Sequence, residues 1–245
     1  SYSTDLIGFS PAQDLAGDAV PDRDNALAQW FARKGLAVRT LPRTAANQFD
    51  VATPTDLLIL QVHPGAGPRT RACLASLDLA APVHRLRRAM ALLRDVNAEV
   101  IVAGRVGSHS WQALEAGTAC RVRLFAEERG MVADGREARG EVRSLLGLYL
   151  EQVGLPRFFL ELATLGQAAF IDTRVLFAHF GLRLSAADRF LSDLGLAHEI
   201  SHPWVREFTQ AAIGAPIPVV LGGHSLVSGG MLALMEAARA TPQLA

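Results

Sequence analysis

A chain of 245 residues, half of them apolar and a fifth charged, has ample material for a buried core and lacks the composition of a disordered protein. Its 24 basic and 24 acidic residues cancel, so no global field would steer it to nucleic acid or to an anionic membrane. The composition therefore predicts no nucleic-acid partner and no membrane partner. The length suits either one large α/β domain or two halves of roughly 100 to 140 residues.

Cysteine spacing and hydropathy argue against a zinc-binding protein and against a membrane protein. Cys73 and Cys120 have no CxxC or CxxxH neighbours, so we interpret them as buried thiols and not as zinc ligands. No apolar run approaches the roughly 18 residues of a membrane span, and no signal peptide opens the chain. We therefore expect a cytoplasmic protein. Lys34 is the single lysine, so chemistry that needs a lysine would have to use it.

The first part of the chain alternates apolar runs with helical patterns. Strands are predicted at 5–9, 36–41 and 56–62, and helices at about 22–34, 69–78 and 83–96. Gly35 and Pro42 bound the second strand, and Pro64 follows the third. The polar residues between 43 and 55 indicate a loop with at most one helical turn.

The same alternation continues to the end of the chain. Further strands are predicted at 99–103, 121–126, around 170–171, at 197–201 and at 218–221, and helices at 109–116, about 136–153, 185–194, 203–213 and 229–240. Continuous apolar strands separated by helices indicate a largely parallel sheet with helices on its faces. The expected fold class is α/β, two-lobed, with a Rossmann-like parallel sheet.

A glycine turn after the strand at 99–103 is the most informative motif. Gly104 stands where the strand turns toward a helix, so the backbone there can approach a phosphate at the helix N-terminus. The full G-x-G-x-x-G pattern is absent, because Val106 and His109 occupy the second and third glycine positions. A dinucleotide site and an ordinary βαβ turn without ligand are both compatible with this pattern.

If a dinucleotide binds here, five residues are the candidates for contacting it. Gly104 and Gly107 would admit the pyrophosphate, and Arg105 and Ser108 could bind it directly. Glu127 follows the next strand, 23 residues after Gly104, where a carboxylate would bind ribose hydroxyls. The implied cofactor is NAD or NADP.

A second glycine turn, Gly222-Gly223-His224-Ser225, resembles the nucleophile elbow of α/β-hydrolases. Val227 replaces the last glycine of that motif, and no histidine follows the serine. A hydrolase triad in the usual order Ser, acid, His is therefore disfavoured, and a turn that packs or closes over a ligand fits better.

Polar residues near the predicted strand ends raise an alternative fold, a (β/α)₈ barrel with a metal at its rim. These residues are His63, His109, Glu127, Asp172, Glu199, His202 and His224. The corresponding function is a metal-dependent sugar isomerase or epimerase. Residues 42–55 are too short and too polar for a barrel helix, which argues against this alternative.

Taken in order, several short motifs resemble shikimate dehydrogenase and its relative methylene-tetrahydrofolate dehydrogenase. They are Leu6-Ile7-Gly8, Pro21-x-x-Asp24-Asn25, the strand 57–62 ending at Pro64, Gly104, Ser201-His202-Pro203 with Thr209, and Gly230-Met231-Leu232. The resemblance implies an N-terminal lobe over 1–95, onto which helix 229–240 packs back, and a nucleotide-binding lobe over 98–225. A ligand would bind between the lobes.

Departures from the family pattern imply a different substrate. Gly65-Ala66-Gly67 stand where the family has its catalytic lysine, and Met235 replaces a glutamine. Without such polar partners a polyol would be left unpaired, so we do not expect the shikimate reaction. His63, Asp24 and His202 are the candidates for proton transfer.

The sequence thus leads to an NAD(P)-linked oxidoreductase-like protein that acts on a small polar metabolite, with a homodimer as the expected assembly. A catalytically silent ligand-binding or scaffold protein of the same fold is the second hypothesis. The metal-dependent barrel isomerase is the third.

Overall fold

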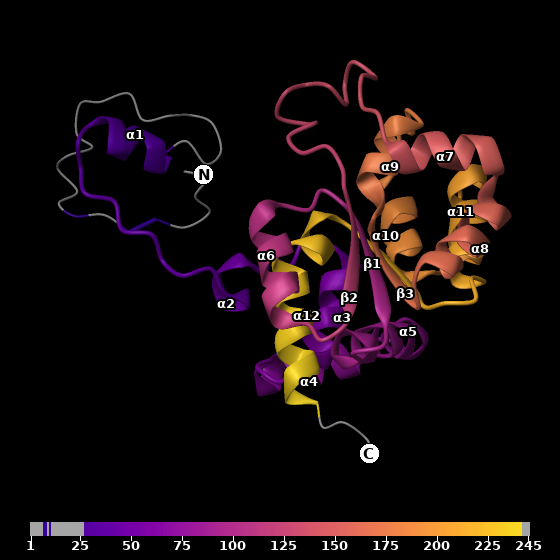
Figure 1. Cartoon of the computed structure of the whole chain (residues 1–245), viewed down its shortest axis with the longest axis horizontal. Coiled ribbons are helices and arrows are strands. Elements are labelled where there is room, and N and C mark those ends of the chain that lie inside the picture. The colour runs from indigo at the N-terminus through magenta and orange to yellow at the C-terminus, as the bar shows by residue number, and fades with distance from the viewer. Residues whose placement is uncertain (1–6, 9, 11–26, 242–245) are drawn as a thin grey trace. The chain divides into compact units, whose positions relative to one another are not determined.

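The computed structural model describes residues 7–8, 10 and 27–241, and the chain's contacts divide it into a unit of residues 1–43 and a unit of residues 44–245 (Figure 1). In the first unit, α1 (Leu27–Arg33) carries an edge-to-face pair of Trp30 and Phe31, with Lys34 Nζ 4.4 Å from the Trp30 ring centroid. Residues 36–41 form no strand, so that prediction is wrong. The predicted strand at 5–9 and Asp24 fall wholly or partly outside the described residues.

The second unit is built on four parallel strands. They are β1 (Glu99–Gly104), β2 (Arg121–Ala126), β3 (Ala168–Asp172) and β4 (Val219–Gly222), in the order β2-β1-β3-β4. The predicted α/β class with a Rossmann-like parallel sheet is confirmed. The barrel alternative is wrong for the described part of the chain, because this sheet is open and does not close on itself.

The remaining elements connect or cover these strands. The helices are α2 (Ala45–Gln48), α3 (Pro54–Val62), α4 (Pro68–Ala75), α5 (Ala80–Ala91), α6 (Ser108–Gly117), α7 (Leu145–Val153), α8 (Leu155–Leu165), α9 (Thr173–His179), α10 (Ala186–Leu194), α11 (Pro203–Ile213) and α12 (Gly229–Ala240), with 3₁₀ turns η2 (Leu92–Arg94), η3 (Ala197–Glu199) and η4 (His224–Val227). None of the helices in the described residues is both long enough and apolar enough to cross a membrane.

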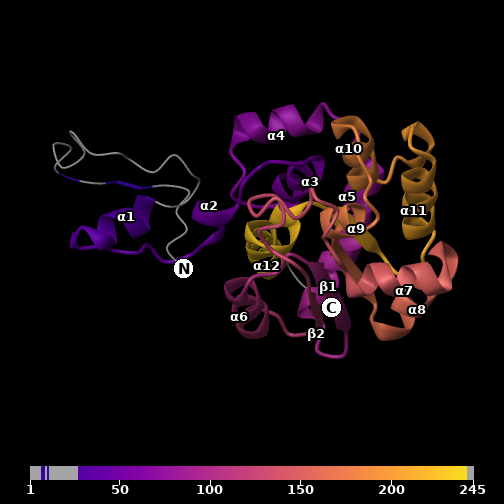
Figure 2. The ribbon, with the colours of Figure 1, turned by 90° about the horizontal axis from the view of Figure 1, so that it is seen from above.

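The helices form a layer on each face of the sheet (Figure 2). Val100 and Val102 of β1 point into a core shared with α3, α5, α6 and α12. Ile101 and Ala103 point the other way, into a core shared with α7, α8, α9 and α11. This alternation follows from the period of two along a strand, and burial on both faces explains why the strands read as continuous apolar runs.

The apolar run at 56–62, predicted as a strand, belongs to α3. Pro54 occupies the first turn, and Asp56 Oδ2 accepts hydrogen bonds from the Thr53 backbone N–H at 2.7 Å and the Thr53 hydroxyl at 3.0 Å. This reciprocal cap satisfies donors that a helix start leaves free. Leu58 and Ile59 then bury their side chains against the sheet.

Two other predictions fail for local reasons. Residues 131–140 are turns and 141–144 are irregular, since Gly130, Gly135 and Gly140 each adopt a positive φ of 68° to 77° that interrupts a helix. The helix predicted over 136–153 is therefore only α7, and α8 follows it with Pro156 in its first turn. Residues 197–201 form η3 and not a strand.

Helices α3 and α5, which precede β1, pack on the same sheet as the helices that follow it. The resemblance implies that the helix at 229–240 packs back on the lobe of residues 1–95, and α12 contacts α2, α3 and α5. These helices belong to one unit that begins at Thr44, whereas the sequence places the boundary between lobes at 95–98.

Candidate functional site at the carboxyl edge of the sheet

The strand order of the sheet reverses between β1 and β3. From β1 the chain crosses to β2 on one side, and from β3 it continues to β4 on the other. In open parallel sheets, ligands bind outside the carboxyl ends of the strands at such a reversal. Gly104 and Asp172, the last residues of β1 and β3, therefore lie at the candidate site.

Gly104 and Asp172 are in close contact at this point. Gly104 has a φ of +122°, and a Cβ added to it would lie 2.4 Å from Asp172 Cβ. Arg105 Nε lies 2.6 Å from Asp172 Oδ2, and its Nη2 lies 3.0 Å from Oδ1. The Asp172 side chain is fully buried, so this two-point ion pair holds Arg105 against the end of β3. The pair uses Nε and Nη2, so Nη1 is the part of the guanidinium that could bind a phosphate without breaking it.

A second buried ion pair lies beside the first. Arg174 donates to both carboxylate oxygens of Asp193, at 3.0 and 2.6 Å, and also to the Thr173 hydroxyl. Burial raises the pKa of Asp193 to about 6, and the carboxylates of Asp172 and Asp56 act in the same direction, while Arg174 opposes them. The removal of Asp193 from water thus outweighs its attraction to Arg174.

Asp56 adds an unusual group to the same region. Its Oδ2 caps α3, but its Oδ1 is buried and has no hydrogen-bond partner among the described residues. A buried oxygen without a hydrogen-bond partner costs about 1–3 kcal/mol, so such groups are few in folded proteins. The carboxyl edge therefore concentrates acidic groups that are held away from water.

His224 lies over the reversal point. It begins η4, which packs against both β1 and β3, and its ring donates a hydrogen bond to the backbone carbonyl of Arg105. Burial, followed by the positive charges of Arg105 and Arg129, lowers the pKa of His224, although Asp172 opposes the shift. The imidazole is therefore neutral near pH 7 and can accept a proton.

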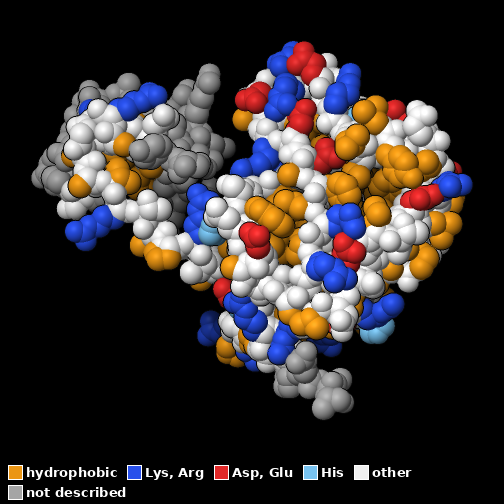
Figure 3. Space-filling view, viewed as in Figure 1, with side chains coloured by type: hydrophobic (Ala, Val, Ile, Leu, Met, Phe, Trp, Pro, Cys, Tyr) orange, Lys and Arg blue, Asp and Glu red, His pale blue; other side chains and the backbone are white. Residues whose placement is uncertain are grey.

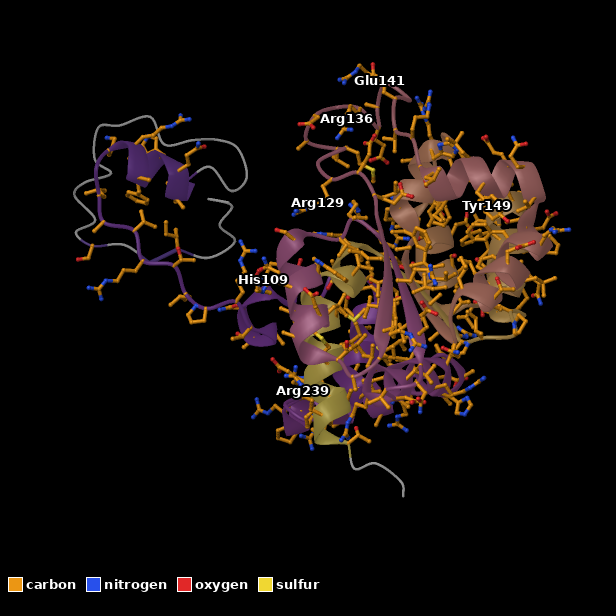
Figure 4. The ribbon with its side chains drawn as sticks, in the orientation of Figure 1. His109, Arg129, Arg136, Glu141, Tyr149 and Arg239 are labelled. Carbon is orange, nitrogen blue, oxygen red and sulfur yellow. The ribbon has the colours of Figure 1, made fainter. Side chains whose placement is uncertain are left out.

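The first turn of α6 lies beside Arg129, one of the two arginines whose charge lowers the pKa of His224. Gly107 is the N-cap of α6, and a Cβ added to Gly107 would lie 3.0 Å from Arg129 Nη1. Figure 4 shows Arg129 on the loop after β2, near this first turn. The Arg129 side chain is exposed and forms no hydrogen bond or ion pair with another described side chain. Backbone N–H groups, the helix dipole and a guanidinium thus meet at one point, which favours an anion.

Some of the residues expected to bind a dinucleotide lie at the first turn of α6, and others already have partners within the protein. Gly107 and the exposed Ser108 lie at the first turn of α6, as predicted. Glu127 instead accepts a hydrogen bond from the Ser144 hydroxyl at 2.9 Å, at the start of α7. Burial raises the pKa of Glu127, and the Ser144 hydrogen bond only partly offsets this. In this structure Glu127 stabilises α7.

The candidates for proton transfer are separated. His63 ends α3 and lies 3.3 Å from Glu236 Oε2 of α12, in the layer on one face of the sheet. His202 is the N-cap of α11 in the opposite layer, and its buried Nδ1 has no hydrogen-bond partner among the described atoms. The structure does not bring these two histidines together, and Asp24 lies outside the described residues.

Two further expectations concern the second glycine turn and metals. The Ser225 hydroxyl donates to the Asp50 carbonyl at 2.8 Å, which ties the loop before α3 to η4. Within residues 27–241 and the few described before them, no group of three or more His, Cys, Asp and Glu side chains could hold a metal ion.

Two cavities in the described part of the chain lie away from the carboxyl edge. A cavity of about 860 Å³ opens between α8 and α11 and is lined mainly by apolar side chains, among them Leu155, Phe159 and Leu160. Figure 3 shows apolar side chains gathered on this side of the molecule, and Leu145 and Tyr149 of α7 are exposed nearby in the chain. The other cavity, about 220 Å³, lies at the start of β4.

No protein-family description matches this chain, and no curated protein or solved structure matches it significantly. The site must therefore be interpreted from its own geometry.

Sequence reasoning missed four charged residues of this edge. They are Asp56, Arg129, Arg174 and Asp193. Asp56 carried a signal, because the spacing from Thr53 to Asp56 after Ala52 and before an apolar run matches a helix cap. Arg174 and Asp193 are 19 residues apart and carried no local signal.

Proposed function

We propose that this protein binds a small metabolite with a phosphate or carboxylate group at the carboxyl edge of its sheet, and that His224 exchanges a proton with it. The proposal depends on one observation, the meeting of the unpaired Arg129 guanidinium with the first turn of α6 at Gly107. An anion there would accept hydrogen bonds from backbone N–H groups and from Arg129.

The surroundings of His224 support the proton transfer. The neutral ring is oriented by the Arg105 carbonyl, and Arg105 is itself held by the fully buried Asp172. One ring nitrogen is thus used for positioning, which leaves the other to accept a proton. An anion bound at Gly107 would place the rest of a small substrate near this ring.

An NAD(P)-linked oxidoreductase acting on a small polar metabolite is the second candidate, since Gly104 stands at the reversal of the strand order. A dinucleotide is a larger ligand for the same site. Its ribose would have to take Glu127 away from the Ser144 hydroxyl. A ligand-binding protein without catalysis would use the same anion contacts but would not need His224. The expected homodimer also stays a prediction.

Thermal unfolding with inorganic phosphate, NAD and NADP tests the proposal, because a ligand that binds the folded state raises the melting temperature. Phosphate should stabilise the wild type and Arg121→Met, an exposed control on β2, and should stabilise Arg129→Met less. Stabilisation by NADP far beyond that by phosphate would favour the oxidoreductase. Equal stabilisation of Arg129→Met and wild type would contradict an anion site at Gly107.

The role of His224 has its own readout. A bound anion favours the charged imidazolium, so phosphate should raise the pKa of His224 followed by NMR. His224→Gln should still bind phosphate, because it leaves Arg129 and α6 in place. An unchanged His224 titration in saturating phosphate would separate the histidine from the anion site.

A further inference from the structure

A second group of basic side chains surrounds the smaller cavity, at the opposite edge of the sheet. This cavity of about 220 Å³ lies between α5 and the segment that enters β4. Its lining consists of Ala81, His84, Arg85, Arg88, Ile213, Ala215, Ile217, Pro218 and Val219. Because Val219 begins β4, the cavity is at the amino edge, away from His224 and Gly107.

The charge of the cavity wall has one sign. His84, Arg85 and Arg88 lie on one face of α5, as expected for positions separated by three and four residues. The lining contains no aspartate or glutamate. Within the described part of the chain, none of these three side chains forms a hydrogen bond or an ion pair. Their donors are therefore directed to the cavity or to solvent.

Arg85 is the least exposed of the three, and burial lowers its pKa. Its guanidinium lies against Gly195, which ends α10 with a φ of +76°. A Cβ at Gly195 would lie 2.5 Å from Arg85 Nη1, so the glycine permits this close approach. A guanidinium that is partly removed from water without an anionic partner is unfavourable, and a bound anion would remove that cost.

We propose that this cavity is a second binding site, specific for a small oxyanion of the phosphate class, held by Arg85 and Arg88 with His84 as an additional donor. Two guanidinium groups match the geometry of phosphate oxygens and can each bind them at two points. The cavity is smaller than the ~300–1,000 Å³ typical for drug-sized ligands, so the ligand is a free phosphate or the phosphoryl end of a small metabolite. Ile213 and Ile217 would contact a short organic part.

Isothermal titration of the full chain with inorganic phosphate tests this site, using Arg85→Met and Arg88→Met. Arg87→Met is the matched control, because Arg87 is exposed on the same helix and does not line the cavity. Each cavity variant should bind phosphate at this site at least about 10-fold more weakly, since a hydrogen bond to a charged group contributes that much or more. Arg87→Met should bind as the wild type does.

The Arg129→Met variant separates this proposal from the function proposed above. If both sites exist, the wild type binds two phosphates, Arg129→Met keeps the site on α5, and Arg85→Met keeps the site on α6. Acetate and sulfate as competitors distinguish carboxylate from phosphate-class ligands. Displacement by acetate at concentrations equal to phosphate would contradict the phosphate class.

Stability without anions provides the remaining check. Methionine preserves the apolar stem of Arg85 and removes its unpaired charge, so Arg85→Met should melt at the wild-type temperature or above it in anion-free buffer. In phosphate buffer the wild type should have the higher melting temperature of the two. Phosphate affinity unchanged in both Arg85→Met and Arg88→Met would overturn the site, whatever their melting temperatures.

Discussion

Gly104→Ala is the substitution for which the structure makes its sharpest prediction. The residue has a φ of +122°, where an L side chain is strained by about 1–2 kcal/mol. The added Cβ would lie 2.4 Å from Asp172 Cβ and 3.2 Å from Asp172 Cα. Because backbone atoms oppose it, β1 and β3 must separate at this end, with an overpacking cost of about 1–3 kcal/mol. Together we expect a loss of about 3 kcal/mol or more.

Gly107→Ala is its matched control. Gly107 has an ordinary φ of −89°, and its added Cβ would meet only the mobile end of Arg129 at 3.0 Å. We expect a loss of only about 1 kcal/mol, because alanine is a poorer N-cap residue than glycine, together with weaker phosphate binding at the first turn of α6. Urea unfolding followed by far-UV circular dichroism measures both variants. With a slope of about 2 kcal/mol per molar urea, Gly104→Ala should shift the midpoint by more than about 1 M.

A Gly104→Ala protein within about 1 kcal/mol of wild type would refute the close packing of β1 on β3. The comparison also decides between two roles for glycine. A nucleotide-binding role alone predicts that both variants lose ligand and neither loses much stability, whereas the structure predicts a large loss of stability for Gly104→Ala only.

Three further measurements follow from particular contacts. Burial raises the pKa of Asp193 from 3.8 to about 6, so the stability that its protonated form contributes is complete below about pH 4 and is lost as the pH rises through 6. Over this range the free energy of unfolding of the wild type should fall by about 3 kcal/mol relative to that of Asp193→Asn, measured by urea titration at each pH. In Gly229→Ala, the added Cβ would lie 1.8 Å from the Gln48 carbonyl oxygen, so α2 should move away from α12 and the protein should lose about 3 kcal/mol of stability. A denaturant midpoint equal to that of the wild type would refute that contact. Ser144→Ala removes the α7 cap and the hydrogen bond to Glu127 and should cost about 1–2 kcal/mol by the same assay, while Glu127→Gln, which keeps an acceptor, should cost less.

Patterns that depend on near neighbours in the chain were predictable. The strand at 121–126 and the helices at 203–213 and 229–240 have the predicted bounds. In the two helices, the apolar period and a proline or glycine at the first position act within a few residues, so the information is present in the local sequence. The parallel sheet also follows, because apolar strands that alternate with helices have to be buried on both faces.

Apolar runs without a clear period were ambiguous. Residues 56–62 fit a buried strand or a buried helix equally well by hydrophobicity, since both conceal every side chain. The cap that joins Thr53 and Asp56, and the packing of Leu58 and Ile59 on the sheet, decide for the helix. Of the helix predicted over 136–153, only the part after Ser144 is helical, because the Ser144 side chain caps the first turn of α7.

The chemistry of the carboxyl edge depends on contacts between residues far apart in the chain. Arg105 and Asp172 are 67 residues apart, and the topology of the sheet makes β1 and β3 neighbours. Arg105 is visible in the sequence as a possible phosphate ligand, but only the fold shows that a buried carboxylate already neutralises it. Hydrophobic pattern thus indicates which segments are buried, and caps and packing decide whether an ambiguous apolar run is a strand or a helix. The pairing of charges depends on which strand ends meet, and that is a property of the assembled sheet.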